Sequence, residues 1–216
     1  MLKKQTAFII AHYHEKGVVA KDTINLITEM QEYSSQIIFV STNLTDEFAH
    51  EISKIAKVIV RQNTGYDFYS YKLGIEMLGD LKGFKKITLL NSSFVCINPK
   101  TLLSQMMTPV GECRLMGITK SFEISEHIQS YWVGFEGSKL IQSSEFKAWW
   151  NNLQPLDERQ DNINKYEIGM SRYFARKGYP LHQALTLTNK IYLSYSAERL
   201  RVVTFNHKSK MEALIF

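Results

Sequence analysis

The chain has 216 residues, of which 44% are hydrophobic and 22% are charged, values that are ordinary for a globular protein. This length suits one large domain or two small ones. Because no linker, repeat or charge block divides the chain, we treat it as a single domain. Its formal net charge of +5 suits an anionic small ligand, a membrane surface or a nucleic acid. The Lys and Arg residues are spread rather than striped, so a nucleic-acid partner is disfavoured.

The sequence also bears on location. No apolar stretch is long enough to span a bilayer, and Lys3-Lys4 precedes only a short apolar run, so we expect no signal peptide. Cys96 and Cys113 follow no metal-ligand spacing, and we interpret both as free thiols in a reducing compartment. We therefore expect a cytoplasmic protein. The basic residues also permit a peripheral position at the inner face of the cell membrane.

Strand and helix patterns alternate through the first half of the chain and are mixed in the second, which predicts an α/β sheet. Short apolar or β-branched runs predict strands at residues 7–11, 37–40, 58–60, 87–90, 115–119 and 130–135, with weaker strand-like runs at 184–188 and 192–195. Helical spacing and caps predict helices at residues 22–33, 46–55, 71–77, 100–107, 145–151 and 162–177. The apolar tail at 211–216 is expected to dock on the body.

Polar residues follow two of the predicted strands at the point where each strand ends. Arg61, Asn63, Gly65 and Asp67 come after residues 58–60, and Asn91-Ser92-Ser93 comes after residues 87–90. Parallel strands joined by a helix bring their carboxyl ends to one edge of the sheet, where open α/β sheets bind ligands. We therefore expect a ligand site at this edge.

Several common motifs are absent from the sequence. It has no phosphate loop ending in Gly-Lys-Ser/Thr, no Gly-x-Gly-x-x-Gly fingerprint and no Gly-x-Ser-x-Gly elbow. His12 and His14 lie two residues apart at a strand end, on one side of it. Since no third ligand of suitable type accompanies them, a zinc site is not indicated.

Four ordered blocks carry a family resemblance. They read R-Q-N-T-G-Y-D-F-Y-S-Y-K-L-G-I at 61–75, L-L-N-S-S-F at 89–94, G-I-T-K-S-F-E-I-S-E-H-I-Q-S-Y-W-V-G-F at 117–135 and K-Y-E-I-G-M-S-R-Y-F-A-R-K-G-Y at 165–179. The set, which runs from about residue 12 to 179, resembles the rhamnan synthesis protein F family of bacterial cell-surface polysaccharide assembly. The resemblance implies a GT-A glycosyltransferase with a Rossmann-like, mostly parallel sheet. It also implies a nucleotide-sugar half at about 1–98 and an acceptor half at about 99–216.

The resemblance implies roles for particular residues. The donor, a nucleotide-diphospho-sugar whose sugar the family name suggests is rhamnose, would contact His12, Tyr13, His14, Thr42, Arg61, Asn63, Gly65, Asp67, Lys72, Asn91, Ser92 and Ser93. The acceptor, a polysaccharide such as lipopolysaccharide or a lipid-linked oligosaccharide of the cell envelope, would lie by His127, Gln129, Ser130 and Tyr131. Glu167 would be the general base of an inverting hexosyl transfer, because a carboxylate within reach of a hydroxyl can take its proton.

One departure from the family bears on metal dependence. The family's fourth strand commonly ends Asn-Asp-Ser, whereas this chain has Asn91-Ser92-Ser93. Mg²⁺ and Mn²⁺ prefer carboxylate oxygens, and Ser92 replaces the usual acidic residue. The chain is therefore metal-independent, or a transferase weakened in its use of Mg²⁺ or Mn²⁺, or a protein that no longer transfers sugar. A metal-independent enzyme would need other positive charge at the leaving diphosphate, from Arg61, Lys72 and helix N-termini.

Other interpretations stay open at this stage. Asp67 could cap the following helix, Arg61 could be a surface residue, and Asn91 could satisfy loop backbone groups. His127 could be a buried structural histidine, and Glu167 could favour a helix N-terminus. The alternative to an enzyme is a non-catalytic GT-A-like module that binds a sugar, a nucleotide or an assembly partner.

Overall fold

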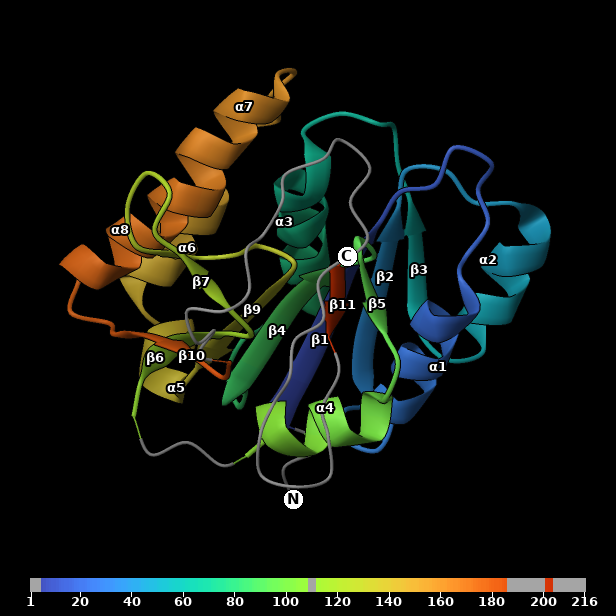
Figure 1. Cartoon of the computed structure of the whole chain (residues 1–216), viewed down its shortest axis with the longest axis horizontal. Coiled ribbons are helices and arrows are strands. Elements are labelled where there is room, and N and C mark those ends of the chain that lie inside the picture. Colours follow the sequence, from blue (N-terminus) through green and yellow to red (C-terminus); the bar gives the residue numbers. More distant parts are fainter. Residues whose placement is uncertain (1–4, 109–111, 186–200, 204–216) are drawn as a thin grey trace.

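The computed structural model describes residues 5–108, 112–185 and 201–203, and its centre is a seven-stranded sheet in the order β10-β6-β9-β4-β1-β2-β3 (Figure 1). β1 (Thr6–His12), β2 (Gln36–Ser41), β3 (Lys57–Val60) and β4 (Lys86–Asn91) pair in parallel. β9 (Trp132–Glu136) is antiparallel to β4 and to β6 (Arg114–Gly117), and β10 (Leu181–Gln183) is parallel to β6. The predicted α/β class with a mixed, mostly parallel sheet is confirmed.

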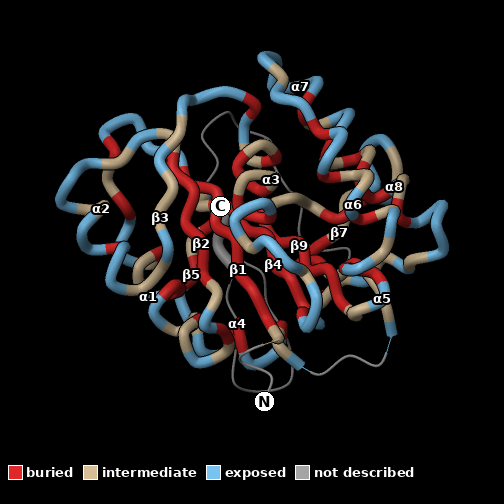
Figure 2. Tube along the Cα trace, turned by 180° about the vertical axis from the view of Figure 1, so that it is seen from behind, coloured by how far each residue is buried: buried red, intermediate tan, exposed pale blue. Residues whose placement is uncertain are grey.

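Helices cover both faces of this sheet. α1 (Lys21–Met30), α2 (Asp46–Ser53) and α4 (Pro99–Met106) contribute to one hydrophobic cluster, and α3 (Tyr66–Leu78), α5 (Ser138–Ile141), α6 (Ser144–Asn151) and α8 (Gly169–Arg176) contribute to the other. Successive side chains of β1 alternate between them: Ile9 joins the α3 cluster, and Phe8 and Ile10 join the α1 cluster. The buried strands therefore form the middle layer, with exposed helix surfaces outside (Figure 2).

Two small ribbons flank the main sheet. β5 (Phe94–Cys96) pairs in parallel with β11 (Arg201–Val203). β7 (Lys120–Ser121) and β8 (His127–Ile128) form an antiparallel hairpin, which we call the β7–β8 hairpin. A helical run then crosses this end of the molecule as α7 (Arg159–Asn162), the π-helical turn η2 (Ile163–Ile168) and α8. The hairpin and the helical run lie together at the carboxyl edge of β4 (Figure 1).

Helix α3 lies close against β1 because the sequence supplies a glycine at the contact. A Cβ atom at Gly74 would lie 2.2 Å from Cγ2 of Ile9, which is too short for any real contact. A residue without a side chain is therefore needed for α3 to pack at this distance from the sheet. This packing places the first turn of α3 beside the end of β4.

Several predicted boundaries need correction. α3 begins at Tyr66 rather than at residue 71, so Asp67 lies in its first turn and not in the preceding loop. The predicted helix at 162–177 contains a π-helical turn, because the chain there is α7, η2 and α8 in succession. The strand predicted at 130–135 is β9, which starts at Trp132, and the strand predicted at 115–119 ends at Gly117. Sequence periodicity finds element types more reliably than ends.

Other predictions fall partly or wholly outside the described residues. A weak strand was predicted at 184–188, but the strand in this region is β10, which ends at Gln183. Ala184 and Leu185 are not in a strand, and residues 186–188 lie outside the described residues. The predicted strand at 192–195 and the predicted docking of the tail at 211–216 lie outside the described residues. Both cysteines are free, with Cys96 buried on β5. Within the part of the chain that the structure describes, every helix is too short or too polar to cross a bilayer.

Candidate functional site

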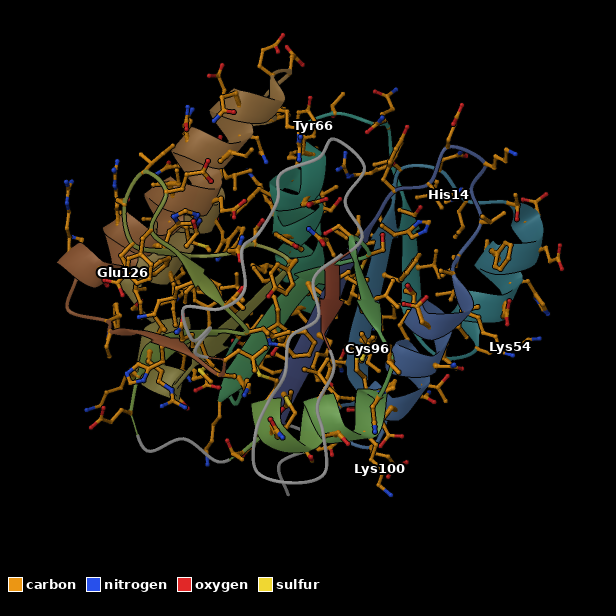
Figure 3. The ribbon with its side chains drawn as sticks, viewed as in Figure 1. His14, Lys54, Tyr66, Cys96, Lys100 and Glu126 are labelled. Atoms are coloured by element: carbon orange, nitrogen blue, oxygen red, sulfur yellow. The ribbon has the colours of Figure 1, made fainter. Side chains whose placement is uncertain are left out.

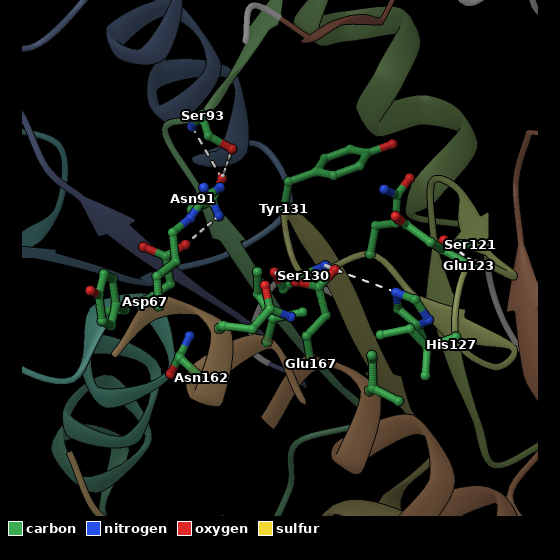
Figure 4. A pocket seen from close by; sticks show the side chains of 17 residues that line it. Asp67, Asn91, Ser93, Ser121, Glu123, His127, Ser130, Tyr131, Asn162 and Glu167 are labelled. Atoms are coloured by element: carbon green, nitrogen blue, oxygen red, sulfur yellow. Dashed lines mark hydrogen bonds and ion pairs between the residues drawn. The ribbon is translucent and has the colours of Figure 1, made fainter. Parts of the chain in front are cut away.

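A cavity of about 320 Å³ lies at the carboxyl edge of β4, between the start of α3, the β7–β8 hairpin and the α7–η2–α8 run (Figure 4). Its walls carry many polar side chains and few apolar ones. The lining residues are Tyr66, Asp67, Asn91, Ser93, Ser121, Glu123, Ile124, His127, Gln129, Ser130, Tyr131, Arg159, Gln160, Asn162, Ile163, Glu167 and Ile168. Seven of the residues predicted to bind donor or acceptor, together with Glu167, thus line one cavity.

The first wall is built by Asp67, Asn91 and Ser93. Asn91 Nδ2 donates to Asp67 Oδ2 at 2.6 Å, while its Oδ1 accepts from the backbone N and the Oγ of Ser93 at 3.1 and 2.5 Å. Both ends of the Asn91 amide are therefore used within the protein. Asp67 uses its Oδ2 in this bond, and Figure 4 shows its carboxylate beside Asn91 at the cavity.

Burial changes the acidity of Asp67. Desolvation raises the pKa of its carboxyl from 3.8 to about 6. The hydrogen bond from Asn91 opposes this rise, Glu167 adds to it, and Arg61 and Arg159 oppose it. Buried carboxyls in clefts with specific charge partners are typical of functional sites, although ion-pair networks produce the same effect. Asp67 is thus a hydrogen-bond acceptor whose pKa is about 6, well above that of a free carboxyl.

The opposite wall carries Glu167. Its Oε2 accepts from Ser130 Oγ at 2.9 Å, and its Oε1 accepts from Ser130 N at 3.3 Å. Ser130 is held in turn by α3, because the Tyr71 hydroxyl donates to the Ser130 carbonyl at 2.9 Å. The carboxylate is therefore fixed in position by two hydrogen bonds from one residue that is itself anchored.

The π-helical turn explains how this helical run faces the cavity. Asn162 and Glu167 line the cavity, as do Ile163 and Ile168, so each pair is five residues apart. In a regular α-helix, residues advance by about 100° each, so a five-residue spacing places them on different faces. In a π-helical turn the hydrogen-bonding interval is five residues, which brings them to one face. Such turns occur often at functional sites.

His127 lies at the base of the hairpin, next to Glu167. Its Nδ1 is 2.7 Å from the Ser125 carbonyl oxygen, and its Nε2 is 3.8 Å from Glu167 Oε1. Ser171 Oγ on α8 accepts the backbone N–H of Ile128 at 3.0 Å, which fixes the hairpin against the helix. His127 and Glu167 therefore face each other across a well-anchored junction (Figure 4).

Arg61 is a predicted donor residue that makes its hydrogen bonds within its own loop. It does not line the cavity, and its guanidinium donates to the carbonyls of Gln62, Thr64 and Tyr66 and to Ser70 Oγ at 2.5–3.0 Å. Gly65 caps α3 with a φ of 69°, and a Cβ there would lie 2.7 Å from Tyr69 Cβ, so the turn requires glycine. Arg61 and Gly65 thus shape the loop that precedes α3. The positive charge of Arg61 also acts on the cavity residue Asp67, whose pKa it lowers.

The remaining predicted donor residues also lie away from the cavity lining. His12 is buried, with Nδ1 2.9 Å from Ser41 Oγ and Nε2 3.1 Å from the Val18 carbonyl. Burial lowers the pKa of His12 to about 4, so it brings no positive charge to a phosphate at neutral pH. Lys72 donates to the Leu153 carbonyl at 2.8 Å and so joins α3 to the end of α6. The others that do not line it are Tyr13, His14, Thr42, Asn63 and Ser92, with His14 in the loop after β1 (Figure 3).

Several cavity residues were missed by sequence reasoning. Arg159 is a basic side chain that lines the cavity, where Arg61 and Lys72 had been expected. Asn162 is 7% exposed, and its Oδ1 has no hydrogen-bond partner among the described residues. Glu123 lines the cavity from the hairpin. Ile163 and Glu167 are four residues apart, a spacing that places them on one face of an ordinary α-helix. Asn162 and Glu167 are five residues apart, and only the π-helical turn places those two on one face.

The donor set can be tested against a resident Mg²⁺ or Mn²⁺. No group of three or more His, Cys, Asp or Glu side chains suited to a metal ion occurs in residues 5–108, 112–185 and 201–203. At the end of β4 the Asn91 amide oxygen is already used by Ser93, and Ser92 supplies a hydroxyl where a carboxylate is preferred. The side chains of this edge therefore do not fit a divalent cation held by the protein itself.

Comparison with known families shows which family the chain belongs to. The model of "Rhamnan synthesis protein F" matches residues 9–198. The chain belongs to the rhamnan synthesis protein F family. All four blocks that carry the resemblance in the sequence lie inside the matched range, as do both walls of the cavity.

Two curated relatives and one solved structure give further comparisons. The chain is 22% identical over 183 residues to the uncharacterized protein y4gN of Sinorhizobium fredii, covering 79% of this chain and 46% of that protein. It is 29% identical over 131 residues to the virulence protein VirA of Vibrio anguillarum, covering 56% and 39%. The chain thus spans less than half the length of these relatives. Among solved structures, a cytidylyltransferase from Leptospira borgpetersenii superposes with a TM-score of 0.48 and 11% identity. The superposition covers 86% of this chain and 78% of the cytidylyltransferase chain.

Proposed function

We propose that this family member is a glycosyltransferase that moves a sugar from a nucleotide-diphospho-sugar to a polysaccharide or lipid-linked acceptor. The family supports a role in polysaccharide synthesis, and the family name is the reason to test rhamnose first. The observation that carries the proposal is the Glu167 carboxylate, which Ser130 holds at the wall of a cavity shared with Asp67 and Asn91. This cavity occupies the sheet edge where α/β enzymes bind ligands.

The charges of the cavity indicate how the substrates lie. Asp67, Glu123 and Glu167 present carboxylates, and Arg159 presents a cation. Carboxylates form strong hydrogen bonds with hydroxyl groups, so the acidic side of the cavity suits a neutral sugar. An anionic diphosphate is repelled by those carboxylates and attracted by Arg159. We therefore place the sugar between Asp67 and Glu167, and the diphosphate toward Arg159.

The reaction follows from this placement. The acceptor hydroxyl attacks the anomeric carbon, the new carbon–oxygen bond forms, and the bond to the diphosphate breaks. Glu167 takes the hydroxyl proton, and the nucleoside diphosphate leaves with the electron pair of the broken bond. A single displacement of this kind inverts the anomeric configuration. Alignment of two bound substrates supplies much of the rate, because it replaces a bimolecular encounter in water.

The test uses the full chain with a panel of nucleotide sugars and a bacterial envelope extract as the acceptor source. Released nucleoside diphosphate is measured for the wild type, for Glu167→Gln and for the control Glu51→Gln, whose side chain is exposed on α2. We expect Glu167→Gln to lose activity by about 10²- to 10⁴-fold while it still binds the donor. Unchanged turnover in Glu167→Gln would refute the base assignment.

The same assay covers the metal and the non-catalytic alternative. We propose transfer that is independent of Mg²⁺ and Mn²⁺, because the edge of β4 lacks a suitable donor set; loss of activity in a chelator would contradict this. The non-catalytic alternative is favoured by the closed Asn91–Ser93 network, which leaves no free amide at the end of β4. A chain that binds nucleotide sugar but releases no diphosphate with any acceptor would support that alternative.

The peripheral membrane position and the lipid-linked acceptor remain parts of the proposal. The basic composition supports attraction to anionic lipids, which would bring the cavity near a membrane-bound acceptor. Flotation with vesicles that contain anionic or only neutral lipids tests this. We expect binding to the anionic vesicles that is lost at high salt; equal binding to both kinds would contradict an electrostatic attachment.

A further inference from the structure

His127 has a fixed hydrogen-bonding arrangement. The side chain is 6% exposed, and its Nδ1 lies 2.7 Å from the Ser125 carbonyl oxygen. A carbonyl oxygen only accepts hydrogen bonds, so Nδ1 must carry the proton and donate it. The other ring nitrogen, Nε2, is then left with a free lone pair, which can accept a hydrogen bond.

Nε2 faces the carboxylate of Glu167. The distance from Nε2 to Glu167 Oε1 is 3.8 Å, and both carboxylate oxygens already accept hydrogen bonds from Ser130. A neutral Nε2 and an ionised carboxylate are both acceptors, so a direct hydrogen bond between them requires one proton. At 3.8 Å the two atoms form no hydrogen bond in this structure, but a small approach with one proton present would make one.

We propose that His127 is a positioning residue that acts through Glu167 and does not contact the sugar. This inference rests on the proposed transfer reaction. After Glu167 takes the proton of the acceptor hydroxyl, that proton passes to Nε2 of His127 and then to water. The carboxylate returns to its ionised form and the ring to its neutral form, so no other group is consumed. The sequence had placed His127 among the acceptor contacts.

The surroundings support a fixed pair. Arg172 of α8 donates to Ser125 Oγ at 2.9 Å, and Lys120 pairs with Glu126 at 2.6 Å across the hairpin. These contacts hold the Ser125 carbonyl that orients the ring. The other charged groups at this cavity are Glu123 on the hairpin, Asp67 on α3 and Arg159 on α7. Catalytic hydrogen bonds are often long without substrate and shorten in the complex, so 3.8 Å is compatible with proton transfer.

A double-mutant cycle tests the proposal. His127→Gln is made in the wild type and in Glu167→Gln, with His182→Gln, exposed on β10, as a control. In the wild type we expect kcat to fall by about tenfold or more with the KM for the acceptor unchanged. In the Glu167→Gln background we expect no further loss, because His127 acts only through that carboxylate. An equal loss in both backgrounds, or a raised acceptor KM, means that His127 contacts the substrate and overturns the proposal.

A second measurement needs no activity, so it separates this inference from the proposed function. ¹⁵N spectra of the His127 ring report which nitrogen carries the proton in the free protein. We expect Nδ1 to carry it, and we expect the Nε2 resonance to move in Glu167→Gln but not in the control Glu51→Gln. Two results overturn the pairing. One is a neutral ring with its proton on Nε2, and the other is an Nε2 chemical shift that is the same in Glu167→Gln as in the wild type. Absence of any transfer by a wild type that passes this test refutes the proposed function alone.

Discussion

Replacement of Asp67 by Asn separates stability from function at the cavity. The carboxyl is desolvated, which raises its pKa from 3.8 to about 6, so at neutral pH the folded protein holds a charge that burial disfavours. Asn has nearly the same shape, and its Oδ1 can still accept from Asn91 Nδ2, a bond of 2.6 Å in the wild type. We therefore expect Asp67→Asn to be more stable than the wild type at pH 7.

The magnitude follows from the pKa. A rise from 3.8 to about 6 corresponds to about 3 kcal/mol of destabilisation at pH 7, at 1.36 kcal/mol for each tenfold change in proton affinity. The sign is opposite to that of a salt-bridged carboxyl. The folded state binds the proton more tightly, so the contribution of Asp67 to stability is greatest below pH 4 and falls as pH rises toward 6. The figure is an upper limit for the gain in Asp67→Asn.

Urea unfolding at several pH values between 4 and 8 measures this difference. We expect the two proteins to have similar free energies of unfolding at pH 4, and the advantage of Asp67→Asn to grow until about pH 7 and then level off. Asp46→Asn, at an exposed position in the first turn of α2, is the control. A difference that does not change with pH, or a less stable Asp67→Asn at pH 7, would show that burial does not govern this carboxyl. Donor binding by Asp67→Asn should be weaker despite its higher stability.

Three further substitutions test the local structure. Arg61→Ala should lower the free energy of unfolding, measured in urea, by about 2 kcal/mol, because three backbone carbonyls lose a charged hydrogen-bond donor. An unchanged free energy would contradict a structural role and favour a ligand contact for Arg61. Gly74→Ala should lower the melting temperature, because its Cβ would overlap Ile9 at a cost of about 1–3 kcal/mol; an unchanged melting temperature would contradict the close α3 contact. Asn162→Leu should raise stability by about 1 kcal/mol by removing an unpaired Oδ1, yet weaken sugar binding in calorimetry; unchanged binding would exclude Asn162 from the site.

The sequence predicted the parts of the site that depend on position along strands and on chemical type. Asp67 and Asn91 follow predicted strands, and parallel strands bring such residues to one edge, so their meeting was expected. Glu167 and Ser130 belong to separate blocks of the family resemblance, and the structure joins them by two hydrogen bonds. The α/β class also followed from the alternation of patterns, because each period reflects which side chains are buried.

Arg61 and His12 are predicted donor residues that the structure places outside the lining of the cavity. Both are polar residues at strand ends, which is the pattern that predicts ligand contacts. Arg61 instead donates to the carbonyls of its own loop, and His12 lies between Ser41 and the Val18 carbonyl. A strand end places a residue near an edge but does not set the direction of a long side chain. That direction depends on which nearby backbone groups need a hydrogen bond.

The amino-acid sequence by itself determined the sheet-based fold, the family and the edge at which polar residues gather, because these depend on local periodicity and on residue order. Only the tertiary structure decided which side chains share the cavity. The π-helical turn brings Asn162 and Glu167 to one face, and the hairpin sets His127 against Glu167. These pairings depend on distances between segments far apart in the chain, which packing fixes and periodicity does not record.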